Sequence, residues 1–373
     1  MVEFSGRVES VSISGIREVF EAADGDAINL GLGQPDFPTP EHARVAAVEA
    51  IQSGAADAYT SNFGTESLRE AIVQKHRRDD DLELSTDQII ATAGGSEALH
   101  LALEAHVDAG EEVIHPDPGF VSYSALTKLA GGTPVPVSLR KDLTLSPSKV
   151  EEHITEDTSA IIINSPANPT GAVQPPEDMR EFARIADEHD VLLISDEVYE
   201  QIVFEGTHRS PMEFAESDNV VLINAASKAY SMTGWRLGWV VASERRIERM
   251  VRVHQYIQAC ASAPAQHAAE AALRGPQDQV EEMVEAFETR RDVLRSGLEE
   301  MGLSVPEPRG AFYVMPEVPE GWVEELIDRG VVVVPGAAFG DAGEGYARIS
   351  YATDLETLRE ALDIMEAATE AVR

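Results

Sequence analysis

Polar side chains follow three apolar stretches of the sequence, each at the point where the stretch ends. Asn168 follows "AIIIN" within "SPANPTG", Asp196 and Tyr199 follow "VLLIS" within "DEVYE", and Lys228 follows "VVLIN" within "AASKAY". In an open α/β sheet, ligands bind beyond the carboxyl ends of the strands. We therefore expect an amide, a carboxylate, a phenol and an amine to converge on one crevice.

Lys228 is the least expected member of this set, because only five lysines occur among the 29 basic residues of the chain. It lies in "SKAYSMTGWRLGW", among small residues and tryptophans rather than in a charged surface stretch. Taken singly, each residue has an ordinary structural interpretation: a turn for Asn168, a helix cap for Asp196 and a solvated amine for Lys228. Their shared placement after strands favours a functional site.

A phosphate-binding element is predicted where "GGSEAL" follows the apolar run "IIATA" and opens a helix. The free backbone N–H groups and the dipole at a helix start both attract anions. The pattern is neither the GxGxxG dinucleotide motif nor a P-loop, so it identifies no nucleotide site. A phosphate seat, a carboxylate, a phenol, an amide and a lysine together match the requirements of pyridoxal 5'-phosphate.

The elements that position these residues follow from the pattern of apolar runs. Between residues 89 and 243 such runs alternate with helical patterns, which predicts an α/β domain around a mostly parallel sheet. A long helix is expected from Gln277 to Met301, and after it "AFYVMP", "VVVVPG" and "ARISYA" alternate with two helices. We expect residues 35–275 to form a large cofactor-binding domain, and residues 1–34 with 276–373 to form a smaller α/β domain.

The composition excludes several classes of function. With 373 residues and 43% hydrophobic content the chain can bury a large core, yet 66 acidic against 29 basic residues give a formal net charge of −37. Nucleic acid is an unsuitable partner, because its binding requires a basic surface. The acidity favours adaptation to high salt over a surface that attracts a cation, since molar salt screens self-repulsion.

Two further observations bear on the cellular location of the protein. The single cysteine, Cys260, excludes an intrachain disulfide and fits a reducing compartment. No segment approaches the roughly 20 apolar residues needed to cross a bilayer. We therefore expect a cytoplasmic protein with no membrane partner, and the sequence predicts no metal site.

Four motifs carry a resemblance to a known family. In their order and separations, "NPTG", "SDEVY", "SKAYSMTGWRLG" and "RISYA" resemble the class I and II pyridoxal phosphate-dependent aminotransferases of fold type I. The similarity runs from "LGLGQPDFPTP" to the C-terminal helix. "PGFVSY", "MTGWRLGW" and "FGDAGEGYARISYAT" are most similar to the archaeal aromatic and aspartate aminotransferases.

The resemblance implies roles for the residues at the strand ends. Lys228 resembles the lysine that bonds to the cofactor aldehyde and later shuttles a proton. Asp196 resembles the carboxylate that keeps the pyridine nitrogen protonated, which makes the ring an electron sink. Tyr199 and Asn168 match the donors to the 3'-oxygen of the ring.

The resemblance also implies how the phosphate is held. Gly95 and Ser96 at the helix start, with Ser227 and Arg236 from the lysine loop, match the phosphate ligands of the family. Arg236 stands eight residues after Lys228, as the phosphate arginine of the family does. Ala225 is a departure, because many relatives carry a hydroxyl there, so one phosphate contact is expected to be missing.

Four more residues complete the implied site. Phe120 matches the aromatic residue that stacks on the cofactor ring, although core packing is its alternative. Arg348 matches the arginine that binds the substrate α-carboxylate, with a surface ion pair as its alternative. Gly33 matches the backbone that approaches that carboxylate. Tyr59 matches a tyrosine that reaches the phosphate in the neighbouring subunit, so a homodimer with a shared active site is expected.

The resemblance implies amino-group exchange between an L-amino acid and a 2-oxo acid. We expect aromatic or large apolar donors with 2-oxoglutarate as acceptor, and aspartate as a poorer donor, because some aspartate-specific relatives carry lysine at the position of Ser96. Arg17 is a candidate partner for a dicarboxylate and equally a surface residue. The alternatives are an aspartate or alanine aminotransferase and a carbon–sulfur lyase on the same fold. A non-enzymatic regulator that binds DNA is disfavoured by the acidity.

Overall fold

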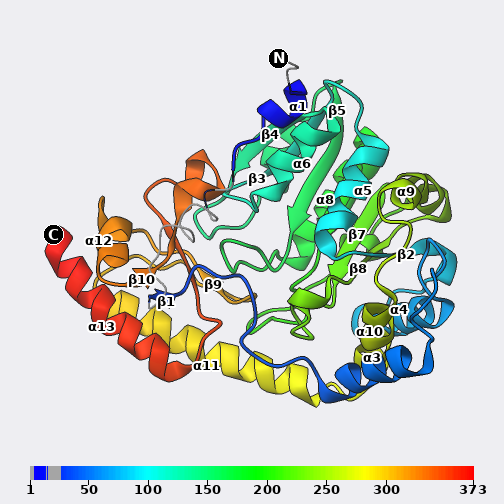
Figure 1. Cartoon of the computed structure of the whole chain (residues 1–373). Helices are drawn as coiled ribbons and strands as arrows, with labels where there is room; N and C mark the ends of the chain where they lie inside the picture. The colour runs from blue at the N-terminus through cyan, green and yellow to red at the C-terminus, as the bar shows by residue number, and fades with distance from the viewer. Residues whose placement is uncertain (1–3, 14, 16–26) are drawn as a thin grey trace.

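A computed structural model describes residues 4–13, 15 and 27–373. Its centre is a seven-stranded sheet in the order β2-β8-β7-β6-β5-β3-β4 (Figure 1). The strands are β2 (Ile89–Thr92), β3 (Glu112–Asp117), β4 (Thr133–Ser138), β5 (Thr158–Asn164), β6 (Leu192–Asp196), β7 (Val220–Ala225) and β8 (Gly238–Val241). Only β8 is antiparallel to its neighbours, so the predicted mostly parallel sheet is confirmed.

Helices cover both faces of this sheet because its strands are apolar on both sides. Ile161 and Ile163 of β5 point to one face, where α7 (Pro147–Glu152) and α8 (Pro176–His189) pack. Ala160 and Ile162 point to the other, where α5 (Gly95–His106), α6 (Ser122–Ala130) and α9 (Glu244–Ile257) pack. The β2–β8 end is covered by α3 (Glu41–Ser53), α4 (Glu66–Asp80) and α10 (Ala263–Arg274). A short helix, α1 (Gly6–Glu9), contacts α6.

Two smaller sheets lie beside this unit. A three-stranded sheet has the order β11-β12-β9, and a two-stranded parallel sheet pairs β1 with β10. The strands are β1 (Ile28–Asn29), β9 (Tyr313–Val314), β10 (Val331–Val332), β11 (Val334–Pro335) and β12 (Ala347–Ser350). They pack with α11 (Asp278–Glu300), α12 (Trp322–Asp328) and α13 (Leu355–Val372). The architecture is α/β throughout, and the domain boundaries at residues 35 and 275 stay a prediction.

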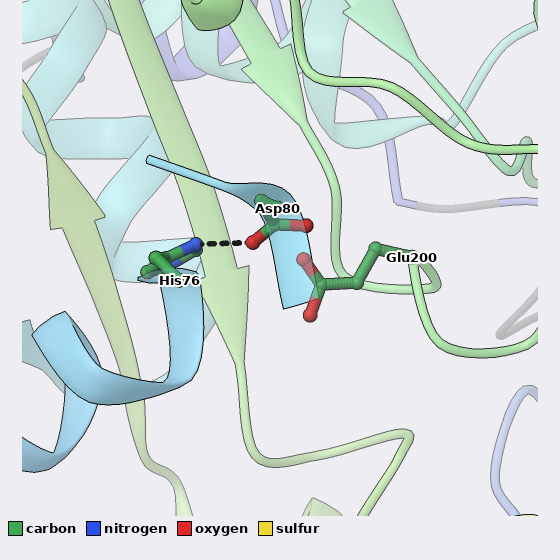
Figure 2. Close-up of side chains that lie close together, drawn as sticks. All are labelled: His76, Asp80 and Glu200. Carbon is green, nitrogen blue, oxygen red and sulfur yellow. Dashed lines mark hydrogen bonds and ion pairs between the residues drawn. The ribbon is translucent and has the colours of Figure 1, made fainter. Parts of the chain in front are cut away.

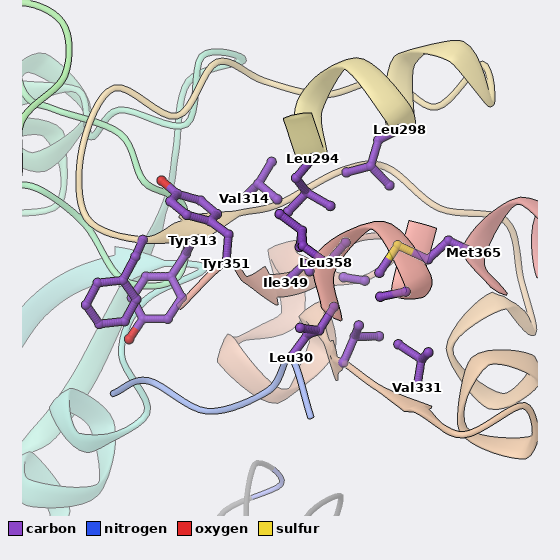
Figure 3. Close-up of a cluster of buried hydrophobic side chains, with 14 of the residues drawn as sticks. Leu30, Leu294, Leu298, Tyr313, Val314, Val331, Ile349, Tyr351, Leu358 and Met365 are labelled. Carbon is purple, nitrogen blue, oxygen red and sulfur yellow. The ribbon is translucent and has the colours of Figure 1, made fainter. Parts of the chain in front are cut away.

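The apolar core of the smaller part explains why its helices form where they do (Figure 3). The residues of α13 that face this core are Leu358, Ala361, Met365 and Ala368, which recur with the 3.6-residue period of a helix. Leu294 and Leu298 of α11 meet them, together with Ile349 of β12. This core anchors β9 and β12, whose side chains reach the site described below. No described helix is long and apolar enough to cross a bilayer.

Candidate active site

A cavity of about 380 Å³ opens at the carboxyl ends of the central strands. The last residues of β5 and β6, Asn164 and Asp196, are paired neighbours in the sheet, so the segments that follow them emerge side by side. Every residue predicted for the site except Tyr59 lines this cavity: Gly33, Gly95, Ser96, Phe120, Asn168, Asp196, Tyr199, Ser227, Lys228, Arg236 and Arg348. Tyr59 lies outside it and is 89% exposed. Arg17 is outside the described residues.

Lys228 follows β7 and points its amine across the cavity. Its Nζ donates a hydrogen bond of 2.6 Å to the carbonyl oxygen of Gly33. Burial, and then the positive charge of Arg348, lower the pKa of Lys228 to about 8, although Asp196 raises it. An amine with this pKa is partly unprotonated near neutral pH, which is the form that attacks a carbonyl carbon.

Asp196 ends β6 and is almost fully buried. Tyr123 donates a hydrogen bond of 2.8 Å to Oδ2, and the backbone N–H of Val198 donates one of 3.4 Å to Oδ1. Burial raises the pKa of Asp196 to about 6, while the Tyr123 hydrogen bond lowers it. A buried carboxylate without a cationic hydrogen-bond partner stabilises a protonated ring nitrogen placed against it.

Arg348, on β12, is a buried cation that no carboxylate of the described residues neutralises. Its guanidinium donates to Asn168 Oδ1 at 2.9 Å and to the carbonyl oxygen of Gly31. It lies over the rings of Tyr313 and Phe339, at 4.6 and 4.7 Å from their centroids. Among the described residues no acid forms an ion pair with Arg348, and its Nε has no hydrogen-bond partner. In a chain with 66 acidic residues, this arrangement is suited to an anion from outside.

The start of α5 and Arg236 form a second anion-binding corner. Gly94 precedes the helix with φ +87°, a conformation that favours glycine. A Cβ atom on Gly94 would lie 2.6 Å from Nη2 of Arg236, so a side chain there would displace the guanidinium. Arg236 donates only to the carbonyl oxygens of Thr233 and Ala93 within the described chain. Helix N–H groups beside an arginine suit a phosphate dianion.

Comparison with known proteins agrees with this geometry. The family model for aminotransferase class I and II matches residues 25–365. The chain belongs to the class I and II aminotransferases. It is 43% identical to a probable aspartate aminotransferase of Methanocaldococcus jannaschii, over 97% of this chain and 98% of that protein. It is 41% identical to aromatic-amino-acid aminotransferase 2 of Thermococcus litoralis, over 97% of both chains.

A solved structure extends the likeness to three dimensions. The aspartate aminotransferase of Thermus thermophilus with maleate superposes with a TM-score of 0.94 at 37% identity, and the match covers 99% of this chain and 100% of that one. The predicted family and fold type are confirmed. The protein is an aminotransferase, and its cofactor is pyridoxal 5'-phosphate.

The cavity of this aminotransferase fits that cofactor by chemistry. The amine of Lys228 with its lowered pKa, the buried carboxylate of Asp196, and the start of α5 beside Arg236 line one cavity, as the aldehyde, the ring nitrogen and the phosphate require. When bound, the cofactor supplies a protonated ring that withdraws electrons from the substrate Cα.

Tyr123, Asn164 and Tyr313 are among the lining residues that were not predicted as site residues. Tyr123 lies in the first turn of α6, three positions after Phe120, and its backbone N–H donates a hydrogen bond of 3.0 Å to the carbonyl oxygen of Phe120, which precedes the helix. That spacing could have revealed Tyr123. Asn164 holds the loop of Asn168 by accepting a hydrogen bond of 2.8 Å from the Asn168 N–H. Tyr313, inside "AFYVMP", has the sequence signature of an ordinary core strand.

A buried charge cluster lies next to the turn that carries Asp196 and Tyr199, and Figure 2 shows three of its members, His76, Asp80 and Glu200. Glu200, on the same turn, forms an ion pair with Lys75 of α4, and Lys75 Nζ also lies 3.0 Å from Asp80 Oδ2. His76 Nδ1 lies 2.7 Å from that carboxylate, and Trp239 Nε1 donates to His76 Nε2 at 2.9 Å. Both nitrogens of His76 are therefore occupied, and an ammonium group fills the space between the carboxylates.

Proposed function

We propose that this aminotransferase moves the amino group between an L-amino acid with an aromatic or large apolar side chain and a 2-oxo acid such as 2-oxoglutarate. The observation that carries the proposal is the buried Arg348, which has no acid partner in residues 4–13, 15 and 27–373 and is suited to the α-carboxylate of either substrate. The cavity lining contains three cations, Lys228, Arg236 and Arg348. The first two serve the aldehyde and the phosphate, so the described lining offers no further cation to a distal carboxylate.

The residues that line the cavity then divide between binding the cofactor and transferring the proton. Arg236, with Gly95, Ser96 and Ser227, binds phosphate, and Ala225 contributes no hydroxyl to it. Phe120, which lines the cavity, would lie against the ring face. Together these residues would hold the cofactor in place during the reaction.

The proton transfer is the task of Lys228. Its buried amine would hold the cofactor through the aldehyde and, once free, would take up the proton from the substrate Cα. Asp196 would keep the ring nitrogen protonated, and Tyr199 and Asn168 would donate to the ring oxygen. Position 33 has no room for a side chain, because a Cβ there would lie 2.4 Å from the hydroxyl oxygen of Tyr313. Gly33 would therefore offer only its backbone to the carboxylate.

Aspartate is the second candidate donor, and the names of relatives favour it. The proteins of Methanocaldococcus jannaschii and Pyrococcus abyssi are named probable aspartate and aspartate aminotransferase. An aspartate enzyme would need a cation for the second carboxylate, from Arg17 or from a partner subunit. Alanine transfer and carbon–sulfur cleavage remain alternatives on the same fold.

Single-turnover spectra of the loaded enzyme test the substrate proposal. We expect phenylalanine and tyrosine to bleach the visible cofactor band faster than alanine, glutamate or aspartate, because an apolar side chain needs no distal cation. The reverse half-reaction with 2-oxoglutarate should restore the band. Aspartate reacting about tenfold faster than both aromatic amino acids, a difference of about 1.4 kcal/mol in the barrier, would assign the enzyme to the aspartate group.

We propose that the working unit is a homodimer with shared active sites. Val45, Val48 and Ile51 form an apolar stripe on α3, and they are 46%, 50% and 58% exposed. Tyr59, in the loop before α4, and Tyr256, in the last turn of α9, are also exposed. The segments that follow them are in contact, because Asn62 Nδ2 donates to the carbonyl oxygen of Ala259. Exposed apolar residues of this size are typical of an interface, and a second copy of the chain would place Tyr59 in its partner's site.

We also propose that the protein is adapted to a salt-rich cytoplasm. The net charge of −37 destabilises the compact and dimeric states in dilute buffer, and molar salt shortens the screening length to about 3 Å. We expect thermal stability, the dimer fraction and activity to rise together between dilute buffer and molar potassium chloride. Calorimetry and light scattering at matched protein concentration measure the first two. Equal melting temperatures at both salt concentrations would refute the salt adaptation.

A further inference from the structure

Tyr313 connects two residues of the site that lie on different parts of the fold. It begins β9, is fully buried, and lines the cavity (Figure 3). Its hydroxyl oxygen lies 2.8 Å from the hydroxyl oxygen of Tyr199, which follows β6 of the large sheet. Its ring lies under the guanidinium of Arg348, 4.6 Å from the ring centroid. Tyr313 therefore contacts both the phenol and the carboxylate-binding arginine.

The direction of the Tyr313–Tyr199 hydrogen bond follows from the positions of their other neighbours. Each phenol has one hydrogen to donate, and only one of the two hydrogens can occupy the bond between them. In the described part of the chain, Tyr199 is the one hydrogen-bond partner of the Tyr313 hydroxyl. The Gly33 backbone packs closely against that hydroxyl, and the Gly33 carbonyl oxygen already accepts from Lys228. A Tyr313 hydrogen pointing elsewhere would be buried without an acceptor, which costs about 1–3 kcal/mol.

The Tyr199 hydroxyl has an alternative acceptor for its hydrogen, because Tyr199 lines the cavity and is the residue proposed above to donate to the cofactor ring oxygen. When Tyr313 donates to the Tyr199 oxygen, the Tyr199 hydrogen is free to point into the cavity. Both hydroxyl groups are then satisfied as soon as an acceptor is bound there. Donation into the Tyr199 oxygen also polarises its O–H bond and makes it a stronger donor.

We propose that Tyr313 is a positioning residue whose hydroxyl donates to Tyr199 and thereby directs the Tyr199 O–H toward the cofactor ring oxygen, while its ring supports Arg348. The proposal rests on the function proposed above. It explains why position 33 needs glycine: a Cβ there would lie 2.4 Å from the Tyr313 hydroxyl oxygen and would push that hydroxyl away from Tyr199. Tyr313 acts through Tyr199 and takes no direct part in the chemical step.

The test is Tyr313→Phe, which keeps the ring under Arg348 and removes only the hydroxyl. The matched control is Tyr351→Phe, because Tyr351 is a buried tyrosine of the same core whose hydroxyl contacts only the Ala311 carbonyl oxygen at 3.4 Å (Figure 3). The first readout is the pH at which the visible band of the substrate-free, loaded enzyme titrates. A donor to the ring oxygen stabilises the less protonated form of the bound cofactor. We therefore expect the midpoint to rise by about half a pH unit or more in Tyr313→Phe and to stay unchanged in Tyr351→Phe.

A second readout separates positioning from general support of the fold. Tyr313→Phe should lower kcat about three- to tenfold and leave the KM for the amino acid nearly unchanged, since the ring still holds Arg348. The pH midpoint of the double variant Tyr199→Phe/Tyr313→Phe should equal that of Tyr199→Phe alone. Additive shifts, or a wild-type midpoint in folded Tyr313→Phe, overturn the proposal. If Tyr313→Phe does not fold, Gly33→Ala provides the same displacement of the hydroxyl, and an unchanged midpoint there overturns it.

The outcomes distinguish this inference from the function on which it rests. A wild-type enzyme whose visible band responds to amino acids, combined with an unaltered Tyr313→Phe midpoint, removes the positioning role and leaves the aminotransferase reaction intact. A wild-type enzyme whose band responds to no amino acid removes the proposed function and the positioning role together. The apo-protein gives an independent measurement: Tyr313→Phe should bind pyridoxal phosphate about three- to tenfold more weakly than wild type, and Tyr351→Phe equally tightly.

Discussion

Replacing Lys228 with alanine should lower amino-group transfer by a factor of about 10⁴ while the protein still folds. The substitution removes the one amine that reaches across the cavity, where Nζ contacts the Gly33 carbonyl oxygen. Arg348 and Arg236 keep their contacts, so substrate and cofactor should still bind. The measurement is 2-oxoglutarate-dependent exchange with phenylalanine as donor, alongside circular dichroism and a cofactor titration.

Lys141→Ala is the matched control, because Lys141 is exposed and lies far along the chain from every residue of the cavity. It should transfer amino groups at the wild-type rate. A Lys228→Ala enzyme that retains more than about one hundredth of wild-type turnover without added amine would exclude Lys228 as the proton carrier. Partial rescue of that variant by a small primary amine would support the role of the missing ammonium group.

The placement of the site was predictable because it follows from chain connectivity. Asp196 ends β6, Asn168, Tyr199 and Lys228 follow within a few residues of the ends of β5, β6 and β7, and parallel strands have their carboxyl ends at one edge of the sheet. Tyr313 was not predictable in this way. It comes from a different sheet, and a buried tyrosine in an apolar strand resembles any core aromatic until its hydroxyl partner is known.

Two strands of the fold also differ from what the local sequence pattern predicted, because their formation depends on pairing with distant segments. The strand β4 was not predicted, because Pro134 and Pro136 interrupt its pattern, yet it pairs only with β3 at the sheet edge, where proline is tolerated. The run "VVVVPG" was expected to form one strand but forms β10 and β11 in two sheets. Its first part pairs with β1, where Ile28 is the partner of Val331, and no local pattern encodes a pairing across such a distance.

Lys75 is another of the few lysines in the chain. No role was predicted for it from the sequence, and the structure buries it almost completely. Burial alone lowers its pKa, but Glu200, Asp80 and Asp79 raise it above its ordinary value. Lysine is suited to this position because a compact ammonium can contact two carboxylates in a small space. The cluster connects α4 to the turn of Asp196 and Tyr199, so losing it would affect the position of these site residues as well as the stability of the fold.

Replacing Lys75 with methionine should therefore lower the free energy of unfolding by about 3–5 kcal/mol, because Asp80 and Glu200 would remain buried with no cation between them. Denaturant unfolding of the loaded enzyme in molar salt measures the loss. Lys149→Met, at an exposed lysine of α7, is the control and should change the stability by less than about 0.5 kcal/mol. Since buried pairs are screened far less than surface charges, the loss should persist in molar salt.

Adding Glu200→Gln to Lys75→Met should recover part of the stability by removing one of the uncompensated charges. A loss below about 1 kcal/mol for Lys75→Met, or no recovery in the double variant, would mean that the turn carrying Asp196 is held by its apolar packing rather than by this ion cluster.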